Sequence, residues 1–158
     1  MTDTSVTTEP KKTMKKKENY LAVYKANGKK TGAALQLRLH HTGECAFFEA
    51  APQVGEVDSD KPYDWGKKLV VKLGDGDIGK LLHLFNSGGA ALKLYHENAK
   101  GNKIVELKKQ TGNYSGYYLT ISAQAEGKNT RVGLPLSDDE VELMKLALGR
   151  AYLVMLGW

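Results

Sequence analysis

Apolar and polar residues alternate with a period of two over most of this 158-residue chain, a pattern that predicts β-strands. Segment 34–40 shows it most clearly, because its three leucines would face one side of a sheet and its polar residues the other. Strands are expected at about 20–25, 34–40, 44–50 and 67–73, and again at about 91–96, 103–109, 117–123 and 130–136.

A helical pattern follows each group of four strands. Over about 75–86, apolar residues recur at the spacing of one helix face. The two strand-to-helix junctions superimpose at an offset of 63, which aligns Leu73 with Leu136, Ile78 with Val141 and Leu81 with Met144. This likeness indicates an internal repeat; a chance similarity between two junctions is the alternative.

The repeat divides a domain at 19–158 into units at about 19–88 and 89–158, each with four strands and one helix. A duplicated ββββα order predicts the α+β class, with antiparallel meanders. It leaves no room for the alternating strands and helices of a β-α-β enzyme core. Residues 1–18 are rich in threonine and lysine and nearly lack large apolar residues, which predicts a disordered basic tail.

The final helix begins at a clear signal and is apolar on most sides. Ser137 and Glu140 have the spacing of a capping box. A chain of this size can cover one helix face with its own sheet, so the other face is expected to meet a partner subunit. The alternative is complete burial between the two sheets of one protomer. The predicted oligomer-interface residues are Val141, Met144, Leu146, Leu148, Leu153 and Met155.

Composition limits the cellular setting. Cys45 is the only cysteine, which excludes an intramolecular disulfide and suits a reducing compartment. No stretch of about 20 residues is free of charge, so a membrane span is not expected. The tail lacks arginine and contains Asp3 and Glu9, which argues against an organelle transit peptide.

The net charge of +5 is modest, so nucleic-acid binding has to be argued from where the charges gather. The polar faces of the expected strands combine cations, aromatic rings and hydroxyl groups, which suit the phosphates, bases and backbone of a single strand. An ordinary solvated sheet face is the alternative. The residues expected to point outward are Gln36, Arg38, Phe48, Lys68, Lys72, Lys93, Tyr95, Lys108, Tyr118, Thr120, Ser122 and Arg131.

The segment Gly74–Gly79 has the G-x-G-x-x-G spacing of a dinucleotide-binding loop, which would make the protein a small nucleotide-dependent enzyme. Asp75 and Asp77 would place negative charge against the pyrophosphate. The corresponding loop of the second unit, Ser137–Glu140, has no glycine. Helix capping is therefore the favoured interpretation of both loops.

The sequence indicates neither a set of catalytic residues nor a metal site, and no cofactor is expected. The four histidines are scattered, and the neighbours His40 and His41 are expected on opposite faces of a strand. Cys45 lies in an apolar strand and is interpreted as a small core residue.

Four short motifs occur along the chain, among them Tyr-Asp-Trp-Gly-Lys-Lys at 63–68 and Gly-Tyr-Tyr at the start of 116–122. These two resemble the Tyr-Asp-Trp-x-Lys segment and the Gly-Tyr-aromatic strand of the Whirly family of single-stranded DNA-binding proteins. The stretch from 132 to the terminal Gly-Trp looks like its C-terminal segment. Residues 28–35 are similar to its Lys-Gly-Lys-Ala-Ala-Leu motif, but Thr31-Gly32 stands where Gly-Lys would be, so either Lys29 or Lys30 would take the lysine role.

The resemblance implies two four-stranded sheets packed crosswise and a ring-like homotetramer with helices at its centre. It implies single-stranded DNA held between the sheets of neighbouring subunits with little sequence preference, in genome protection, repair or transcription. A related RNA-binding function, like that of guide-RNA-binding proteins of this fold, is the alternative. The motifs add Lys29, Lys30 and Lys67 to the expected nucleic-acid-binding residues. The family is best known from plant organelles and the nucleus, and this N-terminus looks unlike a plant one, so the resemblance favours a cytoplasmic, nucleoid-associated protein of a bacterium or phage. In a eukaryote, an organelle or the nucleus is expected.

Overall fold

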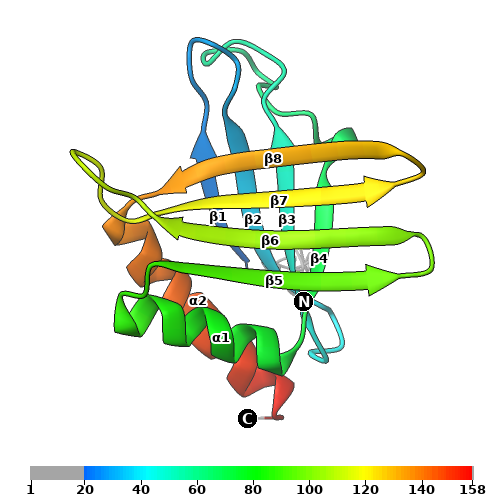
Figure 1. Ribbon diagram of the computed structural model, residues 1–158, viewed down its shortest axis with the longest axis vertical. Coiled ribbons are helices and arrows are strands. Elements are labelled where there is room, and N and C mark those ends of the chain that lie inside the picture. Colours follow the sequence, from blue (N-terminus) through cyan, green and yellow to red (C-terminus); the bar gives the residue numbers. More distant parts are fainter. Residues whose placement is uncertain (1–19, 158) are drawn as a thin grey trace, which may run out of the picture.

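The computed structural model describes residues 20–157, so the tail predicted at 1–18 lies outside the described residues. Its strands form two four-stranded antiparallel sheets, each in chain order (Figure 1). The first sheet consists of β1 (Tyr20–Lys25), β2 (Ala33–Leu39), β3 (Ala46–Pro52) and β4 (Leu69–Leu73). The second sheet consists of β5 (Ala91–Asn98), β6 (Gly101–Lys109), β7 (Tyr117–Ala125) and β8 (Lys128–Leu136).

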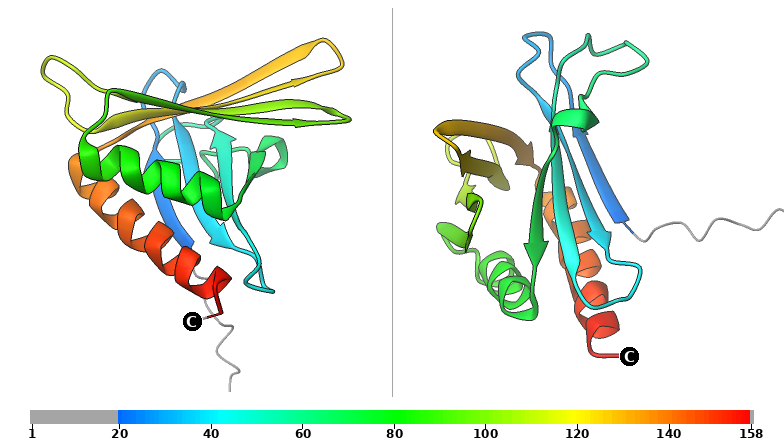
Figure 2. Two further views of the ribbon diagram at one scale, coloured as in Figure 1. Left: turned by 60° about the horizontal axis from the view of Figure 1, so that its bottom comes forward. Right: turned by 90° about the vertical axis from the view of Figure 1, so that its right-hand side faces the viewer.

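Each sheet is followed by one helix, so the predicted duplicated ββββα order is confirmed. Helix α1 (Asp75–Ser87) follows β4, and α2 (Asp138–Met155) follows β8. The two helices lie side by side below the crossing sheets (Figure 2). A short 3-10 turn, η1 (Trp65–Lys67), interrupts the connection between β3 and β4.

The two sheets cross face to face, and the core lies between them. In Figure 1 the strands of the second sheet run across those of the first. Alternate apolar residues of β2 and β8 point into this space, where Leu35 and Leu134 are fully buried. Because alternate strand residues face opposite sides, the polar halves of both sheets are turned away from the core and from each other.

The two helix starts use side chains of the same kind. Asp77 Oδ2 accepts a hydrogen bond from the backbone nitrogen of Gly74 at 3.0 Å. In α2, Glu140 Oε1 accepts from the nitrogen of Ser137 at 2.9 Å, while Ser137 Oγ accepts from the nitrogen of Glu140 at 3.2 Å. The capping interpretation of both loops is therefore confirmed, and the carboxylate of Asp77 fills the start of the helix where a phosphate would have to bind.

Three expectations about side-chain direction have different outcomes. Phe48 was expected to point outward, and this is wrong: it is fully buried in the core and its neighbour Phe47 faces outward. His40 and His41 do not separate to opposite faces, because both follow β2 in a turn where their ring centroids lie 4.1 Å apart. Cys45 is buried, as expected of a small core residue.

No helix within residues 20–157 is long and apolar enough to cross a membrane. The same residues bring no three His, Cys, Asp or Glu side chains together in an arrangement that could hold a metal ion.

Candidate nucleic-acid interface

The outer face of the first sheet carries one row of side chains that alternates charge and aromatic ring. Arg38 on β2 is paired with Phe47 on β3, and Phe47 is paired with Lys72 on β4. The guanidinium carbon of Arg38 lies 5.3 Å from the centroid of the Phe47 ring, which is a cation–π contact. This row offers a flat surface of the kind on which a base can stack beside a phosphate.

A buried carboxylate neutralises part of this face. Glu49 on β3 is only 4% exposed, and its Oε1 lies 3.0 Å from Arg38 Nη2 and 3.4 Å from Lys68 Nζ. Burying an ionised carboxylate costs free energy unless it is paired, so the folded state requires the ion pairs of Glu49 with both cations. Arg38 and Lys68 therefore do not act as two independent phosphate contacts. The Arg38 Nε is the one buried side-chain nitrogen or oxygen of residues 20–157 that lacks a hydrogen-bond partner.

The other predicted residues of the first half differ in position and exposure. Gln36 is half-buried on β2, while Lys67 and Lys72 are exposed. Lys29 and Lys30 lie together in the exposed β1–β2 turn, at the opposite end of β2 from Arg38. Lys30 forms an ion pair with Glu56 at 2.9 Å, which leaves Lys29 as the better placed of the two for a phosphate.

The outer face of the second sheet is open and carries two exposed tyrosines. Tyr95 on β5 is 55% exposed and Tyr118 on β7 is 41% exposed. The Tyr118 ring lies across Gly133 of β8, since a Cβ at that glycine would come within 2.9 Å of the ring. Tyr118 therefore presents a supported, preoriented ring to solvent. The cations that surround these rings are Lys93, Lys108 and Arg131, all of them exposed.

Thr120 points outward as expected, but it is only 5% exposed, so its hydroxyl is not accessible on this face. It faces outward on an interior strand, paired with Glu106 on one side and Gly133 on the other. A short side chain in the middle of a sheet is covered by the longer side chains around it. Ser122, two residues along the same strand, is half-buried. Lys108 Nζ forms an ion pair with Glu106 Oε1 at 3.1 Å, so the charge of Lys108 is partly offset.

The residues predicted for an oligomer interface divide between the two sides of α2. Val141, Met144 and Leu148 are buried in the protomer's own core, so they are not available to a partner, and the half-buried Met155 packs against the same core. Leu146 is 72% exposed and Leu153 is also exposed. Leu143 is exposed as well and belongs to the same stripe. Because the helix is apolar on most sides, the sequence pattern did not distinguish this exposed stripe from the buried face.

Two residues of the first face were missed by sequence analysis. Phe47 and Phe48 are adjacent and both aromatic, so alternation alone does not decide which one points outward. Glu49 has its two partners 11 and 19 residues away in the chain, and only the strand register brings them together. The site that emerges is a pair of outward faces, one on each sheet, and not a single cleft.

Comparison with known proteins gives the family. Residues 20–147 match the family model described as Whirly transcription factor. Among solved structures, the chain is similar to WHY1 from Arabidopsis thaliana, with 20% identity and a TM-score of 0.67 over 88% of this chain and 92% of that one. It is also similar to the plant transcriptional regulator PBF-2, with 18% identity and a TM-score of 0.70 over 88% of this chain and 82% of that one.

A further neighbour comes from a guide-RNA-binding protein complex bound to a guide RNA. Its identity to this chain is 11%, with a TM-score of 0.70 over 89% of this chain and 94% of that one. At these identities the likeness establishes a common fold. A search among curated protein sequences found no match.

Proposed function

The chain belongs to the Whirly family, and from this premise we propose that it is a non-enzymatic protein that binds single-stranded DNA with little sequence preference. Its cellular role would be in genome protection, repair or transcription. The observation that carries the proposal is the outer face of the second sheet, where Tyr95 and Tyr118 are exposed among Lys93, Lys108 and Arg131. Exposed rings stack on any base and cations bind any phosphate, so such a face has affinity without a sequence code.

We further propose that the protein acts as a homotetramer built around α2. Leu143, Leu146 and Leu153 form an exposed apolar stripe on this helix, and a stripe of this kind on a soluble protein marks an interaction surface. The outer faces of one protomer point away from each other, so one segment of DNA cannot contact both within a single chain. Assembly places the face of one subunit beside a face of the next, and the strand would lie between them.

The experiment that tests this function is a competition among labelled single-stranded DNA, duplex DNA and RNA of equal length. At about 150 mM salt, distant surface charges are largely screened, so binding that survives reflects close contacts. Single-stranded DNA is expected to bind most tightly, because the bases of a duplex are already stacked and inaccessible to the tyrosines. Equal binding of duplex and single strand would contradict the proposal.

RNA is the second candidate ligand, because a solved neighbour of this fold is a guide-RNA-binding complex. Tighter binding of RNA than of DNA in the same competition would favour it. A nucleotide-dependent enzyme is a third candidate and receives less support, since Asp77 Oδ2 and Asp75 Oδ1 both accept hydrogen bonds from the backbone of their own loop, at 3.0 and 2.9 Å. A saturable complex with NADH or ATP at micromolar concentration would restore it.

A further inference from the structure

A groove of about 540 Å³ runs between α1 and β5 at one edge of the second sheet. In the strand order of that sheet, β5 lies at the edge beside β6, and α1 lies next to it (Figure 1 and Figure 2). The volume falls in the range of ligand-binding sites, about 300–1,000 Å³. The lining residues that matter here are Gly76, Gly79, Lys80, His83, Leu84 and Leu92.

The backbone of β5 has unpaired hydrogen-bonding groups along its free edge. The nitrogen of Lys109 on β6 donates to the carbonyl oxygen of Ala90 at 2.8 Å. Because an antiparallel strand turns alternate residues toward its partner, the N–H and C=O groups of Ala91, Lys93 and Tyr95 point away from β6. Within residues 20–157, no further strand pairs with this edge. An open edge of this kind is a template for one more strand.

Two glycines of α1 leave room for such a strand. Gly76 and Gly79 lie about one turn apart on the side of the helix that lines the groove. A Cβ at either position would meet no atom within 4 Å outside the helix backbone, so no contact in the described chain requires a glycine there. Glycine is also a poor helix former. The effect of both glycines is to keep the groove open beside β5, where the backbone of an added strand would lie about 4.8 Å from that strand.

The charges at the groove indicate the chemistry of its partner. Lys80 and His83 line it, and among the described residues no aspartate or glutamate does. At the C-terminal end of α1, Lys109 Nζ donates to the carbonyl oxygen of Gly88 at 3.3 Å and adds a second ammonium group. A segment that carries carboxylates complements this lining. The chain's own residues 1–18 do not, because they contain five lysines and three acidic residues, a net charge of +2.

We propose that the groove binds an extended, acidic segment of a partner protein, which adds to the second sheet as a fifth strand beside β5. The backbone of this segment bonds to the free edge of β5, its apolar side chains pack on Leu84 and Leu92, and its carboxylates pair with Lys80 and Lys109. The site goes beyond the proposed function. Leu92 packs against the core, so the groove lies on the side of β5 opposite the exposed Tyr95 of the outer face.

The test uses a fluorescein-labelled peptide of eight residues, the length of β5, that alternates valine with glutamate. Its fluorescence anisotropy should rise to saturation at one peptide per chain. A peptide that alternates valine with lysine should bind at least about 10-fold more weakly, because like charges then meet at the groove. The valine–glutamate peptide with methylated backbone nitrogens should lose binding as well, because it cannot donate hydrogen bonds to β5.

Two variants alter the groove itself. Gly79→Leu places a side chain in the groove without meeting another part of the fold, and it should weaken peptide binding by between about 5-fold and 150-fold. Ala91→Pro removes one N–H of the free edge and keeps the pairing with β6, and it should weaken binding by between about 2-fold and 10-fold.

A third pair of variants tests the charge. Lys80→Glu reverses a charge in the groove and should weaken binding of the valine–glutamate peptide. Lys128→Glu is the matched control, because it makes the same change at an exposed position of β8, the opposite edge strand of the sheet, and should bind the peptide like the wild type. Equal thermal unfolding shows that all of these variants keep the fold.

The groove proposal is overturned if the wild type binds no acidic peptide, or if Gly79→Leu and Ala91→Pro bind it like the wild type. It also fails if single-stranded DNA displaces the peptide and Gly79→Leu weakens both, because the groove then belongs to the nucleic-acid site. Loss of assembly in Gly79→Leu without peptide would assign the groove to a second copy of the chain instead. Binding of single-stranded DNA by the wild type is measured separately, so the proposed function stands or fails on its own.

Discussion

On the outer face of the first sheet, Arg38 and Lys68 share the buried carboxylate of Glu49, whereas on the second sheet Lys93 and Arg131 stand exposed around two exposed tyrosines. Both sheets have the same strand order and are followed by the same kind of helix. The two halves therefore share an architecture and differ in the chemistry of their outward faces.

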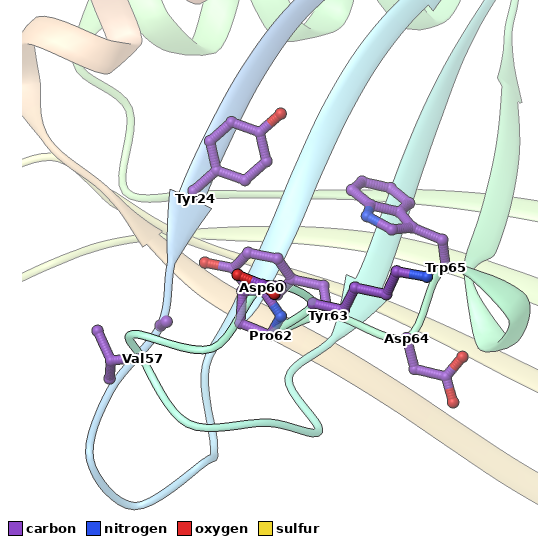
Figure 3. A pocket seen from close by; sticks show the side chains of 9 residues that line it. Tyr24, Val57, Asp60, Pro62, Tyr63, Asp64 and Trp65 are labelled. Atoms are coloured by element: carbon purple, nitrogen blue, oxygen red, sulfur yellow. The ribbon is translucent and has the colours of Figure 1, made fainter.

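One source of the difference is the last connection of each sheet. Residues 53–68 join β3 to β4 and bring Tyr63, Trp65 and Lys68 to the first sheet. Only Glu126 and Gly127 join β7 to β8, so nothing is added to the second sheet from that connection. The long connection adds a pocket and Lys68 to the first face, where Lys68 joins the ion pair of Arg38 and Glu49. Figure 3 shows this pocket, which is lined by the rings of Tyr24, Tyr63 and Trp65. A tight turn leaves the second face as a plain surface of rings and cations.

The largest expected effect comes from separating the faces of neighbouring subunits. Leu146→Asp places a charge in the middle of the exposed α2 stripe, where burial in an interface would leave it unpaired. The wild type is expected to sediment at about four times the chain mass of 17.3 kDa and the variant at the mass of one chain. The variant's affinity for DNA should also fall, because a single face of a monomer does not enclose the strand.

Asn86→Asp adds the same charge to an exposed position of α1 and should leave the assembly unchanged. A wild type that is monomeric at micromolar concentration would remove the tetramer proposal and with it the between-subunit binding model.

The second prediction concerns the open face alone. Tyr118→Ala removes an exposed ring that is supported by Gly133, and should cost about 1–3 kcal/mol of single-stranded DNA binding without changing the salt dependence. Binding isotherms at several salt concentrations measure both quantities.

Arg131→Ala is the contrasting variant on the same face. It should lower the slope of log affinity against log salt by roughly 0.7, which corresponds to one phosphate contact on a single strand. Identical behaviour of the two variants would mean that this face does not separate stacking from phosphate binding.

The third prediction concerns the neutralised face of the first sheet. Glu49→Gln keeps an oxygen that can accept from Arg38 but removes the charge, so Arg38 and Lys68 become free to bind phosphates. Affinity for single-stranded DNA should rise a few-fold, and the salt slope should steepen by up to about 0.7 for each additional phosphate bound. Unchanged affinity and slope would place the strand away from this part of the first sheet.

Lys72→Ala is the matched test on the same face, because Lys72 is exposed and lies outside the Glu49 pair. It should lower the salt slope by roughly 0.7 with the fold intact. Alanine at Arg38 or Lys68 is a poor substitute for this test. Each removes a partner of a buried carboxylate, and the resulting loss of stability would be mistaken for a loss of binding.

Local pattern was enough to predict strand order, helix positions and caps. Leucines at every second position of 34–40 and the Ser137–Glu140 box each encode their structure within a few residues. The strands and helices that they predict occur within a few residues of the expected limits. The resemblance to the Whirly family then supplied the crosswise packing, which no local pattern contains.

The features that could not be predicted depend on contacts between distant residues. Phe48 faces the core because it is paired with Leu37 in the sheet. Glu49 meets Arg38 of β2 and Lys68 of the β3–β4 connection only in the folded chain. In α2, apolar residues surround most of the helix, so periodicity cannot say that Val141 packs inside while Leu146 stays exposed. The aromatic pocket needs Gln53 to join two turns, which only the folded chain makes visible.

The smallest expected effect concerns how the two halves are held together at their helix caps. The cap of α1, Asp77, lies 3.2 Å from His96 of the second sheet, and the cap of α2, Glu140, lies 2.7 Å from Lys25 of the first. Burial raises the pKa of Glu140, but the hydrogen bonds from Lys25 and Ser137 outweigh it and leave that pKa below its ordinary value of 4.5. A carboxyl whose folded-state pKa is lowered stabilises the fold above its unfolded-state pKa, and that contribution is lost as the pH falls through the folded value.

Glu140→Gln isolates this charge, because glutamine still completes a capping box. At pH 7 the variant should lose about 1 kcal/mol of unfolding free energy in urea. As the pH falls below the lowered pKa of Glu140 and the wild-type carboxyl becomes protonated, the difference should shrink. Glu142→Gln is the matched control: its partner Lys145 lies one turn away on the same helix at 2.9 Å, and Glu142 is largely exposed. That variant should change stability by no more than about 0.5 kcal/mol at either pH. If Glu140→Gln destabilised the protein equally at both pH values, the two halves would be joined at this cap by packing rather than by charge.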